Sequence, residues 1–163
     1  MDLVNEKDKV IGRKKRADIY AEGLSNFRVM NAFLRNSKGE LWIPRRTADK
    51  AVFPSCLDIS AAGHVESGET YEDTFRREVM EELNVDVDAV PHRLLGKVTP
   101  TDGLSAFEWV YEIQSDEAPN YNPRDFTEFF WLTPRGLFER ITAGEKVKSD
   151  LPKLVEMFYA DRL

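Results

Sequence analysis

The sequence predicts a mixed α/β domain of the α+β type, in which strands and helices are interspersed. Three observations support this class. Strand-like and helix-like segments follow each other along all 163 residues. No repeat, linker or low-complexity stretch divides the chain, so residues 1–163 are expected to form one domain. With 42% hydrophobic and 32% charged residues, the chain has the composition of a soluble globular protein with a sizeable core.

The first half of the chain predicts short strands and one short helix. Residues 3–11 place two apolar patches around a polar turn, which suggests a small hairpin, and residues 17–23 form a short helix closed by glycine. Residues 27–36 and 41–46 are two strands joined by a tight polar turn. Residues 57–63 predict a further short strand that ends in small side chains.

The second half predicts a helix, three strands and two closing helices. In order, these are a helix at 71–83, strands at 92–99, 104–115 and 129–133, and helices at 134–145 and 151–163. The second of these strands alternates bulky side chains with other residues, as a strand that faces a core does. The helix at 134–145 starts with proline and ends in glycine, the asymmetry expected of helix termini.

Composition excludes several classes of function. A net charge of −6 disfavours binding to a nucleic-acid polymer, which relies on a basic surface. No apolar run approaches the length of a membrane span and the N-terminus has no secretory signal, so we expect a cytoplasmic protein without a membrane partner. Cys56 is the only cysteine, and His64 and His92 are the only histidines, which excludes a disulfide and any site of three histidines.

The helix at 71–83 carries both start and stop signals. Thr70, followed three residues later by Asp73, is a capping pair for the first turn. Asn84 stands where the helix should end, and asparagine tolerates the left-handed conformation of a helix terminus. An apolar residue recurs at every fourth position and would pack this helix on the sheet. These residues are Phe75, Val79 and Leu83.

Three carboxylates of this helix, those of Glu78, Glu81 and Glu82, fall within a sector about 100° wide. Such a cluster is unfavourable unless a cation neutralises it, although a solvated acidic helix face is the simpler alternative. Hard oxygen ligands suit magnesium or manganese rather than zinc. Because magnesium often takes its remaining ligands from waters and substrate phosphates, the cluster indicates hydrolysis of a phosphoanhydride by an activated water.

The surrounding pattern resembles the Nudix box, here at residues 63–85. Gly63 is followed after five residues by Glu69, and after seven more by Arg77-Glu78, an aliphatic residue, any residue and Glu81-Glu82. The fixed charged positions all match, and the chain departs from the pattern only at Asn84, where the family has glycine.

The resemblance implies a fold and a set of roles. The family fold is a mixed β-sheet sandwiched between α-helices. Glu78 and Glu82 would be the main ligands of Mg²⁺ or Mn²⁺, with Glu81 as a further ligand or the general base. Glu69 and Arg77 would hold the loop and the helix in register. The carbonyl of Gly63 would also touch the metal.

Beyond the box, residues 36–70 and the segment "WLTP" resemble the branch that includes isopentenyl-diphosphate isomerases and their hydrolase-like relatives. The isomerases carry an essential cysteine immediately before the glycine–histidine pair, where this chain has Ala62. Cys56 lies six residues earlier and is expected to be a small buried hydrophobe rather than a catalytic thiol. The histidines of the isomerase metal site are also missing, so His64 is more simply a substrate contact or a loop-packing residue.

Four further side chains complete the predicted site. Arg45 and Arg46 end a strand and could hold phosphates bidentately, or form salt bridges at the strand end. Asp125, six residues before Trp131, is the auxiliary acid that related enzymes place on the loop before a late strand, and Glu128 is the second choice. Four aromatic residues are expected in the core, although one could stack on a base: Phe33, Trp42, Phe107 and Trp109.

The sequence therefore predicts a magnesium- or manganese-dependent Nudix hydrolase. Its substrate would be a nucleoside di- or triphosphate, or a related small molecule that contains a diphosphate. Two alternatives remain. One is an isomerase of isopentenyl diphosphate, and the other is a Nudix fold that binds a ligand without catalysis.

Overall fold

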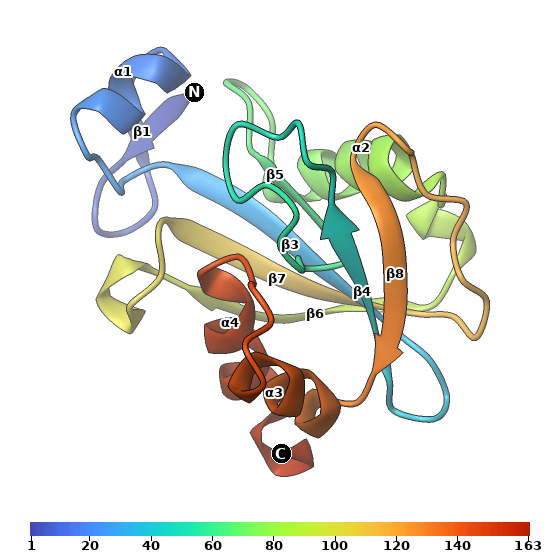
Figure 1. Cartoon of the computed structure of the whole chain (residues 1–163). Helices are drawn as coiled ribbons and strands as arrows, with labels where there is room; N and C mark the ends of the chain where they lie inside the picture. The colour runs from blue at the N-terminus through green and yellow to red at the C-terminus, as the bar shows by residue number, and fades with distance from the viewer.

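A six-stranded mixed sheet forms the centre of the computed structural model, which describes residues 1–163 (Figure 1). Its strands run in the order β6 (His92–Val98), β7 (Phe107–Gln114), β3 (Arg28–Arg35), β4 (Leu41–Arg46) and β8 (Phe126–Leu132), and β5 (Ala61–His64) pairs with β3. Strands β3 and β7 are parallel along their whole length, and the other neighbours are antiparallel. The parallel pair brings two segments that are distant in sequence to the middle of the sheet.

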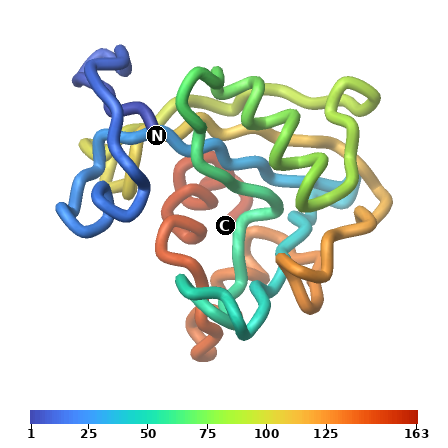
Figure 2. Tube along the Cα trace, turned by 90° about the horizontal axis from the view of Figure 1, so that it is seen from above, coloured from blue at the N-terminus to red at the C-terminus, as the bar shows by residue number.

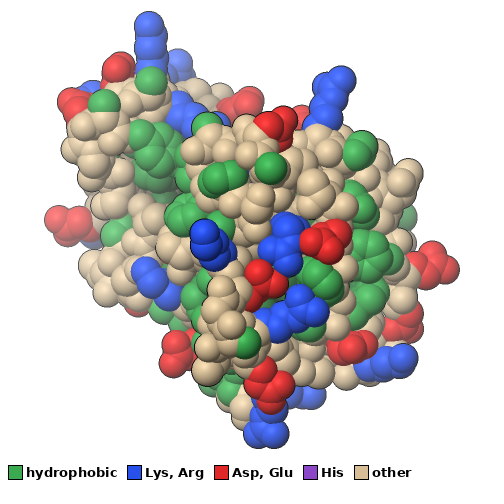
Figure 3. All heavy atoms as spheres, in the orientation of Figure 1, with side chains coloured by type: hydrophobic (Ala, Val, Ile, Leu, Met, Phe, Trp, Pro, Cys, Tyr) green, Lys and Arg blue, Asp and Glu red, His purple; other side chains and the backbone are tan.

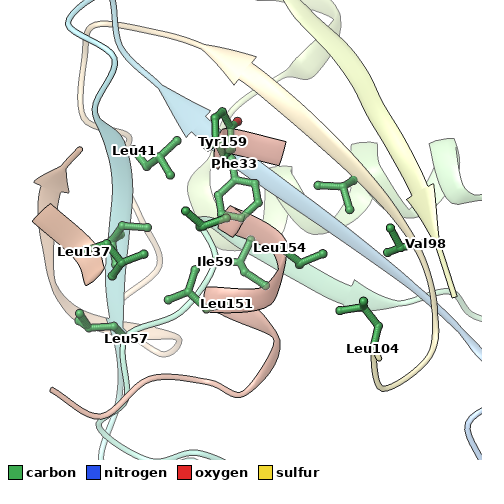
Figure 4. Close-up of a cluster of buried hydrophobic side chains, with 13 residues drawn as sticks. Phe33, Leu41, Leu57, Ile59, Val98, Leu104, Leu137, Leu151, Leu154 and Tyr159 are labelled. Carbon is green, nitrogen blue, oxygen red and sulfur yellow. The ribbon is translucent and has the colours of Figure 1, made fainter. Parts of the chain in front are cut away.

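Helices cover both faces of this sheet because successive side chains of a strand point to opposite faces. On one face, Met30, Ala32 and Leu34 of β3 pack in a core cluster with the predicted apolar stripe of α2 (Tyr71–Leu83). On the other face, Phe33 packs with side chains of α3 (Pro134–Thr142) and α4 (Asp150–Tyr159), as Figure 4 shows. The chain thus has the predicted fold, a mixed sheet between helices.

The N-terminal residues form a small unit beside the main sheet. It consists of the antiparallel strands β1 (Asp2–Val4) and β2 (Val10–Arg13) and the helix α1 (Arg16–Ala21). Figures 1 and 2 show this unit, in dark blue, at one side of the molecule. A third cluster of buried side chains, Ile19, Phe27 and Ala106, joins it to the sheet.

All the predicted elements are present, although several of their ends differ by a few residues: β7 begins three residues after its predicted start and α3 ends three residues before its predicted end. The largest difference is at residues 57–63, where only Ala61–His64 forms a strand. Leu57 makes only isolated bridges to the neighbouring chain segments. Ser60 explains why the strand does not begin earlier. Its side chain takes the place of backbone hydrogen bonds between neighbouring strands. The Ser60 hydroxyl donates to the carbonyl of Trp42 at 2.6 Å and accepts the N–H of Leu34 at 2.9 Å, bridging β4 and β3 where they separate.

Short elements fill the connections. Three 3₁₀ turns follow the larger elements, at Val87–Ala89, Pro100–Asp102 and Ala160–Arg162. Strand β8 starts at Phe126, three residues before the predicted start, because its pairing with β4 extends to Arg46. None of the helices is both long and apolar enough to cross a membrane.

Candidate active site beside helix α2

Helix α2 begins and ends at the residues that its sequence signals predict. The Thr70 hydroxyl accepts the N–H of Asp73, whose carboxylate accepts the N–H of Thr70, so the predicted pair forms a reciprocal capping box. Asn84 takes a left-handed conformation with φ 54° and its N–H donates to the carbonyl of Met80. These two ends fix which residues of the helix face the sheet and which face the site.

An ion pair joins the loop before α2 to the helix itself. The Arg77 guanidinium donates from Nε and Nη2 to both carboxylate oxygens of Glu69, each at 2.8 Å. Arg77 Nη2 also donates to the His64 carbonyl at 3.3 Å. Arg77 therefore connects strand β5, the loop and the helix. Its hydrogen bonds are the first cause of the low pKa of Glu69, which lies at about 2, so this carboxylate is ionised at neutral pH.

Glu78 approaches Gly63 so closely that the glycine has no space for a side chain. A Cβ atom added at Gly63 would overlap the Glu78 carboxyl carbon. On the next turn of the helix, the N–H of Ala62 donates weakly to Glu82 Oε2 at 3.4 Å. Strand β5 and helix α2 thus hold Glu78 and Glu82 together against the backbone of residues 62–63.

The environment of this pair opposes negative charge. The pKa of Glu82 lies well above its usual range, first because of burial and then because Glu78, Asp58 and Asp125 add negative charge nearby. Burial also raises the pKa of Glu78, although Arg77 beside it partly opposes this shift. No lysine or arginine forms an ion pair with Glu82. Arg77 Nη1 donates to Glu78 at 2.8 Å, so within the pair only Glu82 lacks a cationic partner that a bound cation would supply.

Glu81 does not join the pair. Its side chain is 57% exposed and lies 3.5 Å from the Arg77 guanidinium on the outer side of the helix. The predicted sector of about 100° is wide enough for its two edges to face different surroundings. The structure therefore brings together two of the three glutamates and leaves the third at the solvent-facing edge.

Glu78 and Glu82 line a cleft of about 800 Å³. The cleft lies between the N-terminal unit, strand β5, the loop after β4 and the start of α4. Four cationic side chains also line it: Arg16, Arg46, Lys50 and Lys148. An anionic group that enters this cleft would meet cations on the walls and the carboxylate pair on one side, an arrangement suited to a phosphate accompanied by a divalent cation.

The donor set fits magnesium or manganese bound together with a substrate. No three His, Cys, Asp or Glu side chains are arranged to hold a metal ion by themselves. Magnesium, however, commonly uses one or two carboxylates and completes its octahedron with waters and substrate phosphates. The carboxylates of Glu78 and Glu82, beside the backbone at Gly63, provide that smaller set.

Asp125 lies near the carboxylate pair, on the loop that leads into β8. Its negative charge contributes to the raised pKa of Glu82, and its carboxylate accepts a hydrogen bond from Lys50 Nζ at 2.9 Å. The same loop is tied to the end of α2, because the N–H of Asn122 donates to the Glu82 carbonyl at 2.7 Å. Glu128, the second choice, instead pairs with Arg45 at 2.6 Å.

The two neighbouring arginines of β4 have different partners. Arg46 lines the cleft and donates to Asp58 at 2.8 Å. Arg45 points away from it and forms ion pairs with Glu128 and Glu145. Figure 3 shows basic and acidic side chains next to one another near the centre of the face of the molecule that it draws. Only Arg46 of the predicted pair is therefore positioned toward the cleft, and Arg45 is a strand-end ion-pair residue.

His64 lines the cleft in contact with two aromatic rings. Its Nε2 is hydrogen-bonded to the Tyr20 hydroxyl at 2.6 Å, and its ring stacks on Phe27. Burial, followed by the positive charges of Arg16 and Lys148, lowers the pKa of His64 to about 4. The imidazole is therefore neutral at physiological pH.

The four aromatic residues that were expected in the core, one of which could have stacked on a base, do not line the cleft. Phe33, Trp42 and Phe107 are buried, and Trp109 stacks on Tyr71 with ring centroids 4.4 Å apart. Cys56 is also buried and lies outside the cleft. The aromatic lining comes from Tyr20, Phe27 and Phe53, which no sequence pattern indicated as site residues.

Sequence reasoning also missed several polar residues of the cleft region, among them Asp58, Lys50, Lys148, Asn31, Glu108 and Asp150. One signal was available for Glu108. Bulky side chains alternate along β7 from Phe107 onward, and Glu108 points to the opposite face of the strand. Because helices cover both faces of the sheet, a charged residue at this position is unusual and indicates a special role. Asn31 lies in β3 and Asp150 is the first residue of α4. The remaining three residues belong to loops, where no periodicity identifies them.

Comparisons with known proteins show the family and the fold of the chain. The NUDIX domain family matches residues 26–153. An uncharacterized Nudix hydrolase of Nostoc sp. is 58% identical over 162 residues, which cover 99% of this chain and 96% of that protein. The crystal structure of DR0079 from Deinococcus radiodurans superposes with a TM-score of 0.91 at 52% identity, covering 97% of this chain and 98% of that one. The isopentenyl-diphosphate Delta-isomerase of Paenarthrobacter aurescens is 27% identical over 138 residues, covering 81% of this chain and 74% of that protein. The chain belongs to the NUDIX domain family.

Proposed function

We propose that this chain, working as one domain, is a magnesium- or manganese-dependent hydrolase that cleaves the phosphoanhydride of a nucleoside di- or triphosphate or a related small diphosphate. One observation carries the proposal: the half-buried Glu78–Glu82 pair lacks a compensating cation on Glu82 and lines a cleft with four cationic side chains. Family membership supports a hydrolase, and the cleft chemistry supports an anionic substrate.

Each residue of the site has a proposed part. Glu78 and Glu82, with the Gly63 carbonyl, would hold the metal, which when bound neutralises phosphate oxygens and activates the attacking water. Arg46 would contact a substrate phosphate and His64 another part of the substrate. Asp125 and Glu81 are the candidates to take the proton of the water. The Glu69–Arg77 pair would keep the loop and the helix in register.

The first test replaces Glu82 with Gln. The variant removes a negative charge and keeps the size of the side chain, so the fold should persist. We expect turnover to fall by a factor of about 10² or more, as for the loss of a metal ligand or a general base. Release of phosphate and nucleoside monophosphate from a panel of nucleotides, at several magnesium and manganese concentrations, measures this effect. Wild-type turnover with a wild-type metal response in Glu82→Gln would remove the basis of the proposal.

An isomerase is the second candidate, since one relative is an isopentenyl-diphosphate isomerase. The residue before Gly63 is Ala62, whose methyl group can neither donate nor accept the proton that isomerisation moves on carbon. We therefore expect no deuterium in dimethylallyl diphosphate when the protein is incubated with isopentenyl diphosphate and magnesium in deuterated water. Incorporation of deuterium, together with inert nucleotides, would favour the isomerase instead.

A further inference from the structure

Three side chains of the N-terminal unit form hydrogen bonds around the box loop, which is defined here as residues 65–70 between β5 and α2. They are Asp2, Asp8 and Tyr20, and their partners are His64, Ser67, Gly68 and Tyr71. The partners lie in the predicted box, whereas the NUDIX family match begins only at residue 26. The box loop and the residues on either side of it are therefore held by side chains from outside the matched region.

Asp2 holds the turn at the centre of the box loop. The N–H of Glu69 donates to the Glu66 carbonyl at 2.9 Å, and the N–H of Glu66 donates to Glu69 Oε1 at 2.9 Å, which closes the turn. Ser67 and Gly68 are its two corner residues. The Ser67 hydroxyl and, at 3.4 Å, the Gly68 N–H both donate to the Asp2 carboxylate. Because Asp2 is buried and belongs to the β1–β2 hairpin, the hairpin determines where the turn lies.

Asp8 connects the tip of the same hairpin to the first residue of α2. The Tyr71 hydroxyl donates to Asp8 Oδ2 at 2.8 Å, and Arg28 Nε donates to Asp8 Oδ1 at 2.7 Å. The Tyr71 ring is buried and stacks on Trp109, so its hydroxyl has a fixed position. The hairpin tip, the start of β3 and the start of α2 thus meet at one carboxylate.

Tyr20 makes the third contact, at the end of β5. Its hydroxyl is hydrogen-bonded to Nε2 of His64, the residue that follows Gly63 and precedes the box loop. Within the loop, Glu69 forms the ion pair with Arg77 that joins the loop to α2. The N-terminal unit therefore fixes the start, the turn and the end of the segment that positions Gly63 and Glu69.

We propose that the N-terminal unit is a brace for the box loop, in which Asp2 and Asp8 are positioning residues that hold the loop in the shape the metal site needs before a metal binds. This inference rests on the proposed function and extends the site to residues outside the matched family region. Gly68, with φ 86°, leaves the loop conformationally free when nothing holds it. Ordering such a loop costs conformational free energy, and contacts formed during folding remove that cost from metal binding.

Removal of two hydroxyl groups tests the brace without a change in the cleft. Ser67→Ala removes the donor to Asp2 and Tyr71→Phe removes the donor to Asp8, and neither Ser67 nor Tyr71 lines the cleft. We expect the double variant to bind Mn²⁺ about 10-fold more weakly than the wild type, at the lower end of the effects of groups that orient metal ligands. Electron paramagnetic resonance of free Mn²⁺ measures this affinity without substrate. Ser67→Thr keeps a hydroxyl group and should retain the wild-type affinity.

Tyr159→Phe is the matched control. Like Tyr71, Tyr159 is buried and donates its hydroxyl to a carboxylate, that of Glu112 at 2.7 Å. Tyr159 packs on the face of the sheet opposite to α2, so its replacement should lower stability and leave the Mn²⁺ affinity unchanged. Equal weakening of Mn²⁺ binding in Tyr159→Phe and in the double variant would overturn the brace, because general destabilisation would then explain both.

Hydrogen exchange separates this inference from the proposed function. Without metal, the amides of the box loop should exchange about 10-fold faster in the double variant than in the wild type, as expected when hydrogen bonds that hold a segment are lost. Unchanged exchange, or a Mn²⁺ affinity equal to that of the wild type, would overturn the brace. Absence of Mn²⁺ binding by the wild type would instead overturn the proposed metal site, and the exchange rates would still decide whether the N-terminal unit holds the loop.

Discussion

Strand β7 buries two glutamates on the same face, four residues apart, in opposite surroundings. Glu112 accepts a hydrogen bond from the Tyr159 hydroxyl at 2.7 Å and lies within 3.7 Å of Arg35 and 3.4 Å of Arg93. Glu108, at the cleft end of the strand, has no cationic partner and lies beside Asp150. One strand therefore carries a compensated buried carboxylate and an uncompensated one.

The difference between the two glutamates indicates which one contributes to stability and which one contributes to function. A buried charge that is fully paired connects elements, and Glu112 connects β7 with β3, β6 and the end of α4. A buried carboxylate without a cation lowers stability, and such groups concentrate where a protein binds or reacts. The carboxylates that form no ion pair with a lysine or arginine, those of Glu82, Glu108 and Asp150, line the same cleft. The comparison predicts that changes at the cleft alter activity, and that changes at Glu112 alter stability.

The largest effect is expected from Gly63→Ala at the cleft end. The new methyl group would occupy the position of the Glu78 carboxyl group and displace it from Glu82. We expect turnover of the best nucleotide substrate to fall by about 10² or more, comparable to the loss of a catalytic carboxylate. Gly12→Ala is the control, because a Cβ atom there meets nothing within 4 Å. Full activity in Gly63→Ala would show that the close approach of Glu78 is not needed.

The next effect is on stability and comes from Glu112→Ala. The substitution leaves the buried Tyr159 hydroxyl and the half-buried Arg35 without their acceptor. We expect the free energy of unfolding to fall by about 2–3 kcal/mol, whereas Glu108→Gln should change it by less than about 1 kcal/mol. Urea denaturation measures both. A larger loss in Glu108→Gln than in Glu112→Ala would reverse the comparison.

The smallest effect is a change in the pH dependence of stability. The pKa of Glu108 is about 8 in the folded protein against a usual value of 4.5, so the folded state binds a proton that the unfolded state releases. Its contribution to stability is complete at low pH and is lost as the pH rises through the range from 4.5 to about 8. Between pH 6 and 7, wild-type stability should fall by up to about 1.4 kcal/mol more than that of Glu108→Gln.

Metal-free buffers are needed for this measurement, and the difference between the two proteins removes the contribution of the other titrating carboxylates. Parallel pH profiles of wild type and Glu108→Gln would show that Glu108 is ionised in the folded protein.

Local patterns in the sequence determined the main elements and the centre of the site. The capping pair, the apolar stripe and the asparagine at the end of α2 act over a few residues, so they fix the helix and its register without knowledge of the rest of the chain. The i, i+4 spacing of Glu78 and Glu82 then places both carboxylates on one side of the helix. The helix and the clustering of its carboxylates were predictable for this reason, whereas the box and the roles of its residues were expected from the resemblance to the family.

Only the tertiary structure decided which other side chains share the cleft. The hydrogen bond between Tyr20 and His64 joins residues 44 positions apart, and that between Asn31 and Glu108 joins residues 77 positions apart. Arg45 and Arg46 are neighbours in sequence, but alternation along the strand sends them to different partners. Which side chains become neighbours depends on how the N-terminal unit and α4 pack against the sheet and on which strands lie next to β7. The periodicity of a single segment does not contain that information.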